Sequence, residues 1–347
     1  MFIPKDIKIE LLLYDKIQRL FIIILFIFIF FSENHHSNFS NFYNDNKHIP
    51  NLKKGFNKWI VTTAFNPPSP FIINLEKKIK DWKIVVVGNN ETNDAKWYIF
   101  NTSNNLFYLS AFEQNNLNYS IIKYLKKNSC FRKMIGYLYA IQNGAEEIYE
   151  IDEDLEFNNT KLLNTHFENA VVSYGIRNDS LMINPYYYFG EPNVWPRGFR
   201  IGEIGKQQIN KFHHINMRNV DLKPLVFQGL INIIPDVDSI FFLTRRKFNN
   251  LYEFNANISR SYPLIYFPYN YVPINSKNTR YLYEIFPFLI FPISLDENIA
   301  DIWRGYIMQN LAWKQKGIIL YYISDAYKNI SMKNAFNQIN DKNDFCK

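Results

Sequence analysis

Apolar and polar positions divide the chain into an apolar amino-terminal run, a polar stretch and a long region of short strands and helices. The apolar run, Leu20–Phe31, contains no charged residue and follows Lys16 and Arg19. Its twelve residues are fewer than the roughly twenty that span a bilayer, but the run lengthens toward Lys16 if Arg19 extends to the headgroups. We expect a signal-anchor helix over residues 17–32, with residues 1–16 as a cytoplasmic tail.

Two other interpretations of the apolar run explain fewer of its features. A cleaved signal peptide has the same charge and apolar core, but no small-x-small cleavage site follows the run. A buried helix of a globular domain is amphipathic, and this run is not. The polar residues 33–56 show no periodicity, which is typical of a luminal stem between membrane and domain.

Short apolar strands alternate with helices after residue 57. The segments "KWIVTTAF" (58–65) and "WKIVVVGNN" (82–90) are nearly continuous apolar strands, and such strands are buried on both faces of parallel sheets. Between them, residues 71–80 place apolar residues on one helical face and lysines on the other. The order strand, helix, strand predicts a right-handed βαβ unit. Further short strands are expected in "KWYIF" and "LFYLS".

The most regular helix is expected in "CFRKMIGYLYAIQNGA", residues 130–145. Its small residues Gly136 and Ala140 allow another backbone to approach closely, and Asn143-Gly144 is a suitable carboxyl cap. The apolar face is expected to consist of Phe131, Met134, Leu138 and Ile141. The strand "EEIYEI" follows, which completes an α/β pattern.

Three acidic residues, Asp152, Glu153 and Asp154, follow this strand directly. A solvated loop is one interpretation. The other is a metal site, because ligands bind at the carboxyl ends of strands in open α/β sheets and adjacent carboxylates repel unless a cation lies among them. Carboxylates one residue apart suit Mg²⁺ or Mn²⁺, which shares its ligand shell with a diphosphate and stabilises its departure.

Composition excludes some classes of protein. Apolar residues make up 47% of the chain, which excludes a disordered protein. The net charge of +7 comes from scattered lysines without a basic stripe, so we expect no nucleic-acid partner. The two cysteines, Cys130 and Cys346, are too few for a disulfide framework, and whether they pair is open. Several Asn-x-Ser/Thr sequons permit a secretory route.

The stretch "RKMIGYLYAIQNGAEEIYEIDED" resembles the signature of the STELLO family of predicted glycosyltransferases, in which a basic pair, a helix and an acidic triplet follow in this order. Five other stretches between Lys58 and Tyr322 also resemble that family, in the same order: "KWIVTTAFNPPS", "NPYYYFGEPNVWPRGF", "VFQGLINIIPDVDSIFFLTR", "YVPINSKNT" and "DIWRGYIMQNLAWKQKG". The acidic triplet departs from the family at Glu153, where Asp is common; a middle residue is often not a metal ligand.

The resemblance implies a GT-A-like (Rossmann-type) α/β domain over residues 57–325, with a mixed, mainly parallel sheet flanked by helices, and a tail over residues 326–347. It also implies a single-pass type II protein of the Golgi or another secretory-pathway membrane, with this domain in the lumen. Plant members of the family are associated with cellulose synthase trafficking, so membrane enzymes are possible partners. The expected ligands are a nucleotide-sugar donor and a glycan or protein acceptor.

Donor-site residues are expected near the two strand ends. Asp152 and Asp154 would hold Mn²⁺ or Mg²⁺, and Asp152 also the diphosphate. Arg132 and Lys133, at the start of the long helix, would reach donor phosphates, because a helix amino end favours anions; a surface basic pair is the alternative.

The nucleotide base is expected near Thr62 and Thr63, just past the first strand, although strand capping also explains two threonines there. Trp195 would stack on a sugar ring and Arg197 would pair with phosphate, unless both belong to a packed loop.

A second acidic pair, Asp236 and Asp238, would lie near the acceptor or cap a helix or turn. An inverting transfer needs a carboxylate base for the acceptor hydroxyl. Asp301 is the first candidate and Glu297 the second. Arg304, three residues after Asp301, lies on the same helical face, where the two could instead form an ion pair.

These residues predict a metal-dependent glycosyltransferase of the secretory pathway. A non-catalytic Golgi scaffold with the same fold is the alternative. A nucleotidyltransferase that makes activated sugars shares the diphosphate chemistry, but such enzymes are usually soluble, which the predicted anchor contradicts.

Overall fold

A computed structural model describes residues 58–99, 104–157, 167, 169–175, 182–204, 210–219, 221–244, 262–266 and 268–328. The predicted anchor, stem and carboxyl-terminal tail beyond residue 328 lie outside the described residues, as does Cys346. Within the described ranges, no helix combines the length and apolar character that a membrane crossing requires.

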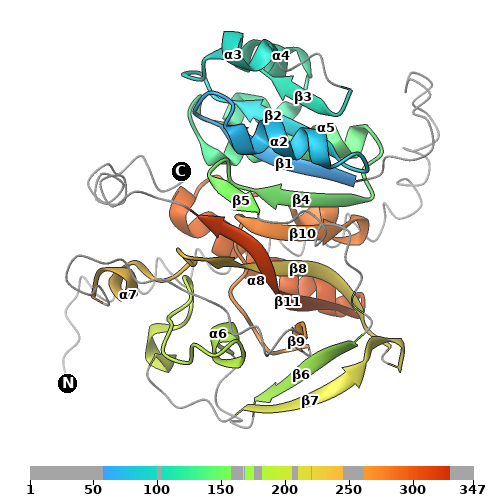
Figure 1. Cartoon of the computed structure of the whole chain (residues 1–347), viewed down its shortest axis with the longest axis vertical. Coiled ribbons are helices and arrows are strands. Elements are labelled where there is room, and N and C mark those ends of the chain that lie inside the picture. The colour runs from blue at the N-terminus through green and yellow to red at the C-terminus, as the bar shows by residue number, and fades with distance from the viewer. Residues whose placement is uncertain are drawn as a thin grey trace, which may run out of the picture. The chain divides into compact units, whose positions relative to one another are not determined.

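Eleven strands within the described ranges form one sheet, in the order β3-β2-β1-β4-β10-β8-β11-β9-β6-β7, with β5 paired to β11 (Figure 1). The strands are β1 (Lys58–Ala64), β2 (Lys83–Gly88), β3 (Leu106–Leu109), β4 (Glu147–Ile151), β5 (Leu155–Phe157), β6 (Asn169–Gly175), β7 (Asn210–Asn216), β8 (Lys223–Asn232), β9 (Leu264–Tyr266), β10 (Asn278–Leu282) and β11 (Gly317–Lys328).

The direction of the strands brings the ends of several of them to one edge. Strands β3, β2, β1 and β4 are parallel neighbours. Strand β10 is antiparallel to both β4 and β8, so β8 runs in the same direction as β4, and β11 is parallel to β8. The carboxyl ends of β1, β2, β4, β8 and β11 therefore meet the amino end of β10. The predicted mixed, mainly parallel sheet is confirmed.

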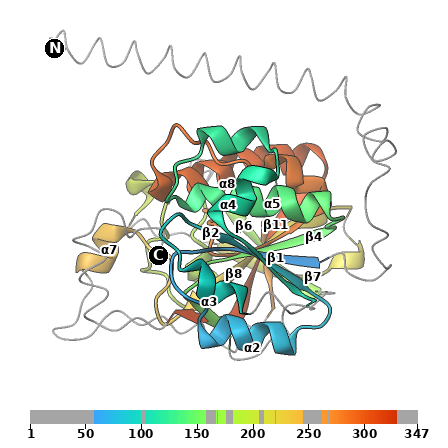
Figure 2. The same ribbon diagram turned by 90° about the horizontal axis from the view of Figure 1, so that it is seen from above.

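Helices cover both faces of this sheet. The described α-helices are α2 (Pro70–Lys78), α3 (Asp94–Tyr98), α4 (Ala111–Asn116), α5 (Lys133–Gln142), α6 (Pro185–Tyr188), α7 (Ser239–Thr244) and α8 (Glu297–Lys314), and the 3₁₀ turns are η1 (Ser120–Tyr124), η2 (Cys130–Arg132), η4 (Ile201–Glu203), η5 (Met217–Asn219) and η7 (Tyr283–Phe288). Figure 2 shows α4, α5 and α8 on one face and α2 and α3 on the other. The predicted flanking helices are confirmed.

Local signals explain where the helices begin. The Ser69 side chain accepts a hydrogen bond from the Ile72 amide at the start of α2, which confirms the predicted helix there. In contrast, the strand predicted in "KWYIF" is wrong: Asn93 caps α3, and Trp97 is buried on that helix. A capped helix satisfies backbone groups locally, whereas a strand at this position would need a neighbour.

The predicted apolar face of α5 is confirmed in part, since Phe131 and Met134 are buried as expected. Leu138 is 38% exposed, whereas Tyr137 and Ala140 are buried. The close approach predicted for the small residues is confirmed, since a Cβ atom on Gly136 would lie 2.5 Å from Val61 Cγ1 of β1. The predicted cap also forms, with Gly144 at a φ of 81°. The close approach at Gly136, in addition to the apolar residues, therefore helps to determine which side of α5 faces the sheet.

Replacing Gly136 with alanine is expected to lower the free energy of unfolding by about 1–3 kcal/mol, because the added methyl group forces α5 away from the sheet. Urea denaturation of the full chain measures this. Gly202→Ala is the matched control, because a Cβ there meets nothing within 4 Å, and it should change stability by less than about 0.5 kcal/mol. An equal effect of the two substitutions would contradict the prediction.

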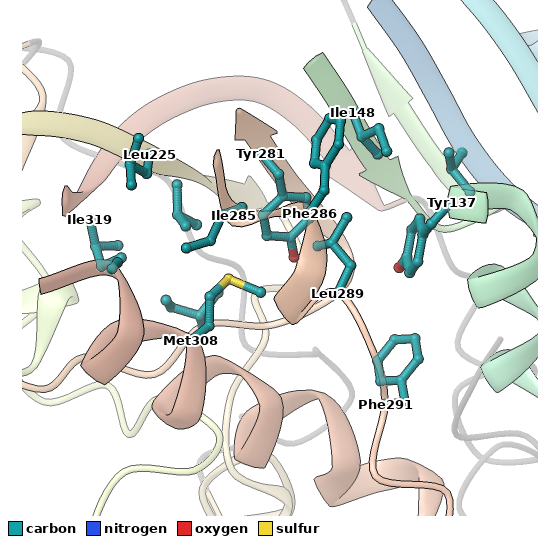
Figure 3. Close-up of a cluster of buried hydrophobic side chains, with 14 of the residues drawn as sticks. Tyr137, Ile148, Leu225, Tyr281, Ile285, Phe286, Leu289, Phe291, Met308 and Ile319 are labelled. Carbon is teal, nitrogen blue, oxygen red and sulfur yellow. The ribbon is translucent and has the colours of Figure 1, made fainter. Parts of the chain in front are cut away.

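The core between α8 and the centre of the sheet contains side chains from distant parts of the chain (Figure 3). Met308 of α8, Leu225 of β8 and Ile319 of β11 are all at most 1% exposed. Tyr281 of β10 is fully buried in the same cluster. This packing fixes α8 against the strands whose ends form the edge described next.

Candidate functional site

The candidate site is the sheet edge where β4 and β8 end and β10 begins. Asp152 directly follows β4, and Asp236 lies four residues after the end of β8. Ser276 and Lys277 directly precede β10. The strand directions therefore bring together polar residues that are far apart in sequence.

Lys133 and Asp152 form a buried ion pair at this edge. Lys133 is the first residue of α5 and is 2% exposed. Its Nζ lies 2.7 Å from Asp152 Oδ1 and donates to the Ser276 carbonyl oxygen at 2.8 Å. Burial disfavours the charged ammonium, but Asp152 and Glu150 outweigh it and raise the pKa of Lys133. Lys133 is thus not the surface residue of the alternative interpretation.

A second buried ion pair lies beneath the first. Glu150, fully buried on β4, accepts hydrogen bonds on Oε2 from Arg304 Nη2 at 2.8 Å and from the Tyr281 hydroxyl at 2.9 Å. The Arg304 guanidinium stacks on Phe291 at 4.1 Å from the ring centroid. Arg304 therefore pairs with Glu150, and the ion pair between Asp301 and Arg304 that the sequence offered as an alternative is not formed.

Glu153, the middle residue of the acidic triplet, fastens the loop after β1. Its Oε2 accepts a hydrogen bond from the Phe65 amide at 2.8 Å, and its Oε1 accepts one from the Asn66 side chain. Burial raises the pKa of Glu153 despite these bonds. Glu153 thus joins the ends of β1 and β4, which leaves the outer two carboxylates to face other partners.

Asp154 pairs with the end of β11. Its Oδ2 lies 2.7 Å from Lys328 Nζ, whereas its Oδ1 is buried and has no hydrogen-bond partner among the residues that the structure describes. Burial disfavours the Lys328 ammonium, but Asp154 and then Asp152 raise its pKa. An unsatisfied buried carboxylate oxygen is uncommon and suits a ligand or ion.

The residues present fit a divalent cation in one respect and compete with it in another. Asp152 and Asp154 supply hard oxygen atoms, including the unsatisfied Oδ1 of Asp154, as Mg²⁺ and Mn²⁺ prefer. No group of three or more His, Cys, Asp or Glu side chains that could hold an ion is found in the described ranges. Lys133 and Lys328 must also give up their contacts with these carboxylates.

A second cluster surrounds Arg197. Its Nε lies 2.9 Å from Asp236 Oδ1, and its two Nη atoms lie 2.8 Å and 2.6 Å from the oxygens of Asp301. Lys277 Nζ adds a contact of 2.8 Å to Asp236. Burial opposes ionisation of both carboxylates, but Arg197 lowers the pKa of Asp301, and Arg197 together with Lys277 lowers that of Asp236.

Ser276 joins the two clusters. Its amide and hydroxyl both lie 3.2 Å from Asp301 Oδ2, and its carbonyl oxygen accepts from Lys133. The predicted site residues Asp152, Lys133, Asp301, Arg197 and Asp236 therefore belong to one connected network of side chains.

Glu297 and Arg132 lie near the start of α5. Glu297 accepts hydrogen bonds from the Ser129 hydroxyl at 2.6 Å and from the Cys130 amide at 3.3 Å. Arg132 is 4% exposed and donates to Gln114 Oε1 and to the Lys126 carbonyl oxygen. Burial lowers the pKa of Arg132. Its position at the helix start agrees with the sequence, but it is a buried residue rather than a surface one.

Thr62 and Thr63 were expected just past the first strand, but they lie inside β1. They pair with Val86 and Val87 of β2, and both are at most 3% exposed. The error has a physical reason: threonine is β-branched and continues a buried strand as readily as valine does.

The loop around Trp195 packs on α7. Trp195 is half-buried, contacts the Phe241 ring at 5.7 Å between centroids, and accepts a hydrogen bond on its carbonyl oxygen from the Asp238 amide at 2.8 Å. Asp238 Oδ1 accepts from the Ile240 amide at 2.8 Å and so caps α7, as the alternative interpretation proposed.

A small pocket opens beside Arg197 and Asp236. Only about 20 Å³ of it is open to the centre of a water-sized sphere, and its polar lining also includes Gln228 and Asn275. The apolar part of its wall comes from Pro185, Tyr186, Pro196, Pro273, Ile302 and other side chains. The pocket thus borders the network that contains Asp301.

Four network residues were not predicted from the sequence: Glu150, Ser276, Lys277 and Lys328. Glu150 could have been predicted, because residues two apart on a strand share a face and Glu150 precedes Asp152 by two. Lys328 and Lys277 contact Asp154 and Asp236 only through the fold, and nothing in the local sequence connects them.

Comparisons with known proteins indicate the family of the chain. No protein-family model matches the chain. The chain is 30% identical over 283 residues to probable glycosyltransferase STELLO1 of Arabidopsis thaliana, with 78% of this chain and 35% of the relative covered. It is 31% identical over 277 residues to probable glycosyltransferase STELLO2 of the same organism, with 76% and 35% covered. The chain therefore belongs to the STELLO family, and it spans 35% of the length of these curated relatives.

Proposed function

We propose that the chain is a GT-A-like glycosyltransferase that moves a sugar from a nucleotide-diphosphate donor to a glycan or protein acceptor. The observation that carries the proposal is the acidic triplet at the carboxyl edge of the sheet, with one buried carboxylate oxygen unsatisfied. The sheet, with a parallel part followed by the antiparallel β10, supports a GT-A-like arrangement. The names of the two relatives support the class of reaction.

In this proposal Asp152 and Asp154 would hold Mn²⁺ or Mg²⁺, and the ion would supply positive charge for the diphosphate leaving group. Arg132 and Lys133 lie at the amino end of α5, where positive charge and the helix dipole favour phosphate. Thr62 and Thr63, buried in β1, form the floor beneath the nucleotide instead of touching the base.

The acceptor is proposed to enter at the pocket beside Arg197 and Asp236. Asp301 is a poor general base, because Arg197 holds both of its oxygens and lowers its pKa. Glu297 is therefore the better candidate of the two predicted bases. Arg304 acts through Glu150 as a positioning residue, since it lies in the core below the edge.

The place in the cell is also a proposal. The apolar run over residues 17–32 and the sequons support a single-pass type II protein of the Golgi or another secretory-pathway membrane. Fusion of an epitope tag to each end, followed by protease protection of isolated membranes, tests the orientation. Protection of the carboxyl-terminal tag alone is the expected result.

A scaffold without activity is the second candidate function, and one observation favours it. Lys133 and Lys328 each neutralise a carboxylate that a cation would need. A chain that has no use for a cation is stable in this paired state. Membrane enzymes are the partners expected of such a scaffold.

Calorimetry with UDP and GDP separates the two functions. The full chain is expected to bind one of them with Mn²⁺ present, and the Asp152→Asn/Asp154→Asn double variant should bind at least about tenfold more weakly. Asp238→Asn is the matched control, because asparagine also caps a helix and this residue serves α7.

Folding of each variant is checked by circular dichroism. Absence of nucleotide binding by the folded, unmodified chain would favour the scaffold over the transferase. Release of pyrophosphate from a nucleoside triphosphate and a sugar phosphate would instead favour a nucleotidyltransferase.

A further inference from the structure

We propose that Lys133 is shared by two carboxylates and moves from Asp152 to Glu150 when a divalent cation occupies Asp152. Lys133 would then be a positioning residue that keeps Asp152 neutralised while the cation is absent. The inference rests on the proposed function, in which Asp152 holds the cation. Glu150 and the exchange itself are additions to that proposal.

A second carboxylate oxygen, Glu150 Oε1, lies within reach of the Lys133 ammonium. Nζ lies 2.7 Å from Asp152 Oδ1 and 3.6 Å from Glu150 Oε1. Glu150 Oε1 is buried and no hydrogen bond to it is found within the described ranges, although the Tyr137 hydroxyl interacts with the Glu150 carboxylate. A movement of roughly 0.8 Å toward it gives the 2.7–2.9 Å separation of a charge-assisted hydrogen bond. The unsatisfied oxygen is therefore a prepared second position for the ammonium.

The Glu150 carboxylate, which would receive the ammonium, is held in a fixed position. Arg304 Nη2 and the Tyr281 hydroxyl both bind Oε2 of Glu150, which prevents the carboxylate from turning. Glu150 and Asp152 are two residues apart along β4 and its extension, so their side chains lie on the same face. Only the flexible lysine side chain needs to move.

Charge favours the exchange once a cation arrives. A cation at Asp152 would lie close to an ammonium that touches the same carboxylate, and like charges in a buried site repel strongly. Transfer of Lys133 to Glu150 removes the ammonium from Asp152 and satisfies a buried oxygen. The positive charge stays in the site, next to the diphosphate of the proposed donor.

Movement of Lys133 would also affect the pocket beside Arg197 and Asp236. Lys133 donates to the Ser276 carbonyl oxygen, and Ser276 also binds Asp301. The next residue, Lys277, binds Asp236 at the pocket wall. Loss of the contact between Lys133 and Ser276 loosens this segment, so occupancy of the cation site would be transmitted to the pocket.

A double-mutant cycle on the full chain tests the exchange. Mn²⁺ affinity is measured from the electron paramagnetic resonance signal of free Mn²⁺ for the unmodified chain, Lys133→Met, Glu150→Gln and the double variant. Lys133→Met is expected to bind Mn²⁺ about tenfold more tightly, because the competing ammonium is gone.

The decisive comparison is the effect of Glu150→Gln in the two backgrounds. It is expected to weaken Mn²⁺ binding about tenfold more when Lys133 is present than in the Lys133→Met variant. Equal effects in the two backgrounds would mean a simple long-range charge effect and would overturn the exchange. Tyr281→Phe is the control, because it removes a contact to Glu150 without changing any charge.

A second measurement needs no substitution, in case a charge variant fails to fold. Hydrogen–deuterium exchange of the unmodified chain is followed with and without Mn²⁺. Faster exchange of the amides of residues 275–277 on Mn²⁺ binding is expected, because Ser276 loses its contact with Lys133. Unchanged exchange of these amides with Mn²⁺ bound overturns the proposal.

The results distinguish this inference from the proposed function. If the unmodified chain binds no Mn²⁺, with or without UDP or GDP, both are overturned. If it binds Mn²⁺ through Asp152 but the double-mutant cycle is additive, the cation site stands and the exchange alone is overturned.

Discussion

Replacement of Arg304 by methionine is expected to lower the free energy of unfolding by about 3–5 kcal/mol, because it leaves the buried Glu150 without its guanidinium partner. Both side chains are at most 2% exposed, so water cannot take the place of the lost charge. Methionine has a similar length and packs against Phe291, which limits the effect of the lost volume. Urea denaturation of the full chain measures the change.

Two further variants show whether lost charge or lost packing causes the destabilisation of Arg304→Met. Arg304→Lys retains a charge near Glu150 but loses the planar guanidinium that also contacts Tyr137 and Tyr281, so an intermediate loss is expected. Tyr137→Phe removes a neutral hydroxyl that accepts from Arg304 at 3.2 Å and also interacts with Glu150, so a smaller loss of about 0.5–1.5 kcal/mol is expected. If Arg304→Met cost no more than Tyr137→Phe, the ion pair would not be the stabilising element.

Replacement of Arg197 by methionine is expected to have a similar effect, about 3–5 kcal/mol near neutral pH. It leaves Asp301 without its bidentate partner and Asp236 with Lys277 alone. Lys277→Met is the matched control and should cost less, since Lys277 contacts a single carboxylate and its side chain is 24% exposed.

The pH dependence gives a second test of the same substitution. In the unmodified chain the folded-state pKa values of Asp236 and Asp301 are lowered, so their contribution to stability is present above the unfolded value of about 4 and is lost as pH falls below it. Without Arg197, burial is expected to raise the pKa of Asp301. Protonation of Asp301 as the pH falls then removes a buried unpaired charge and reduces the destabilisation of the variant. The stability difference is therefore expected to shrink between pH 7 and pH 3. A constant difference would mean that Arg197 acts by packing.

The parts of the fold that local pattern determines were predictable. Continuous apolar strands and the Asn143-Gly144 cap correctly indicated β1, β2, β4 and the end of α5. The buried face of α5 was not predictable from apolar spacing alone. It depends on how closely Gly136 lets the helix approach Val61, which is a property of the packed structure.

The site was predictable as a place but not as a set of pairs. Asp152 and Lys133 could be found because a strand end and a helix start adjoin in any βαβ unit. The partners Arg304 and Lys328 could not, since they are separated from Glu150 and Asp154 by more than 150 residues. The helical spacing of Asp301 and Arg304 suggested a pair, but the first turns toward the loop before β10 and the second toward β4.

The balance of charge at the sheet edge has a consequence for the order in which ligands arrive. Three carboxylates, Glu150, Asp152 and Asp154, are balanced by Lys133, Arg304 and Lys328, while Glu153 accepts from neutral donors of the loop after β1. Balanced ion pairs in a chain with a net charge of +7 exert little long-range attraction on a free cation. The free donor is an anion that the positive chain attracts, and its diphosphate supplies further oxygen ligands, so the donor is expected to bind first and to bring the ion to the site.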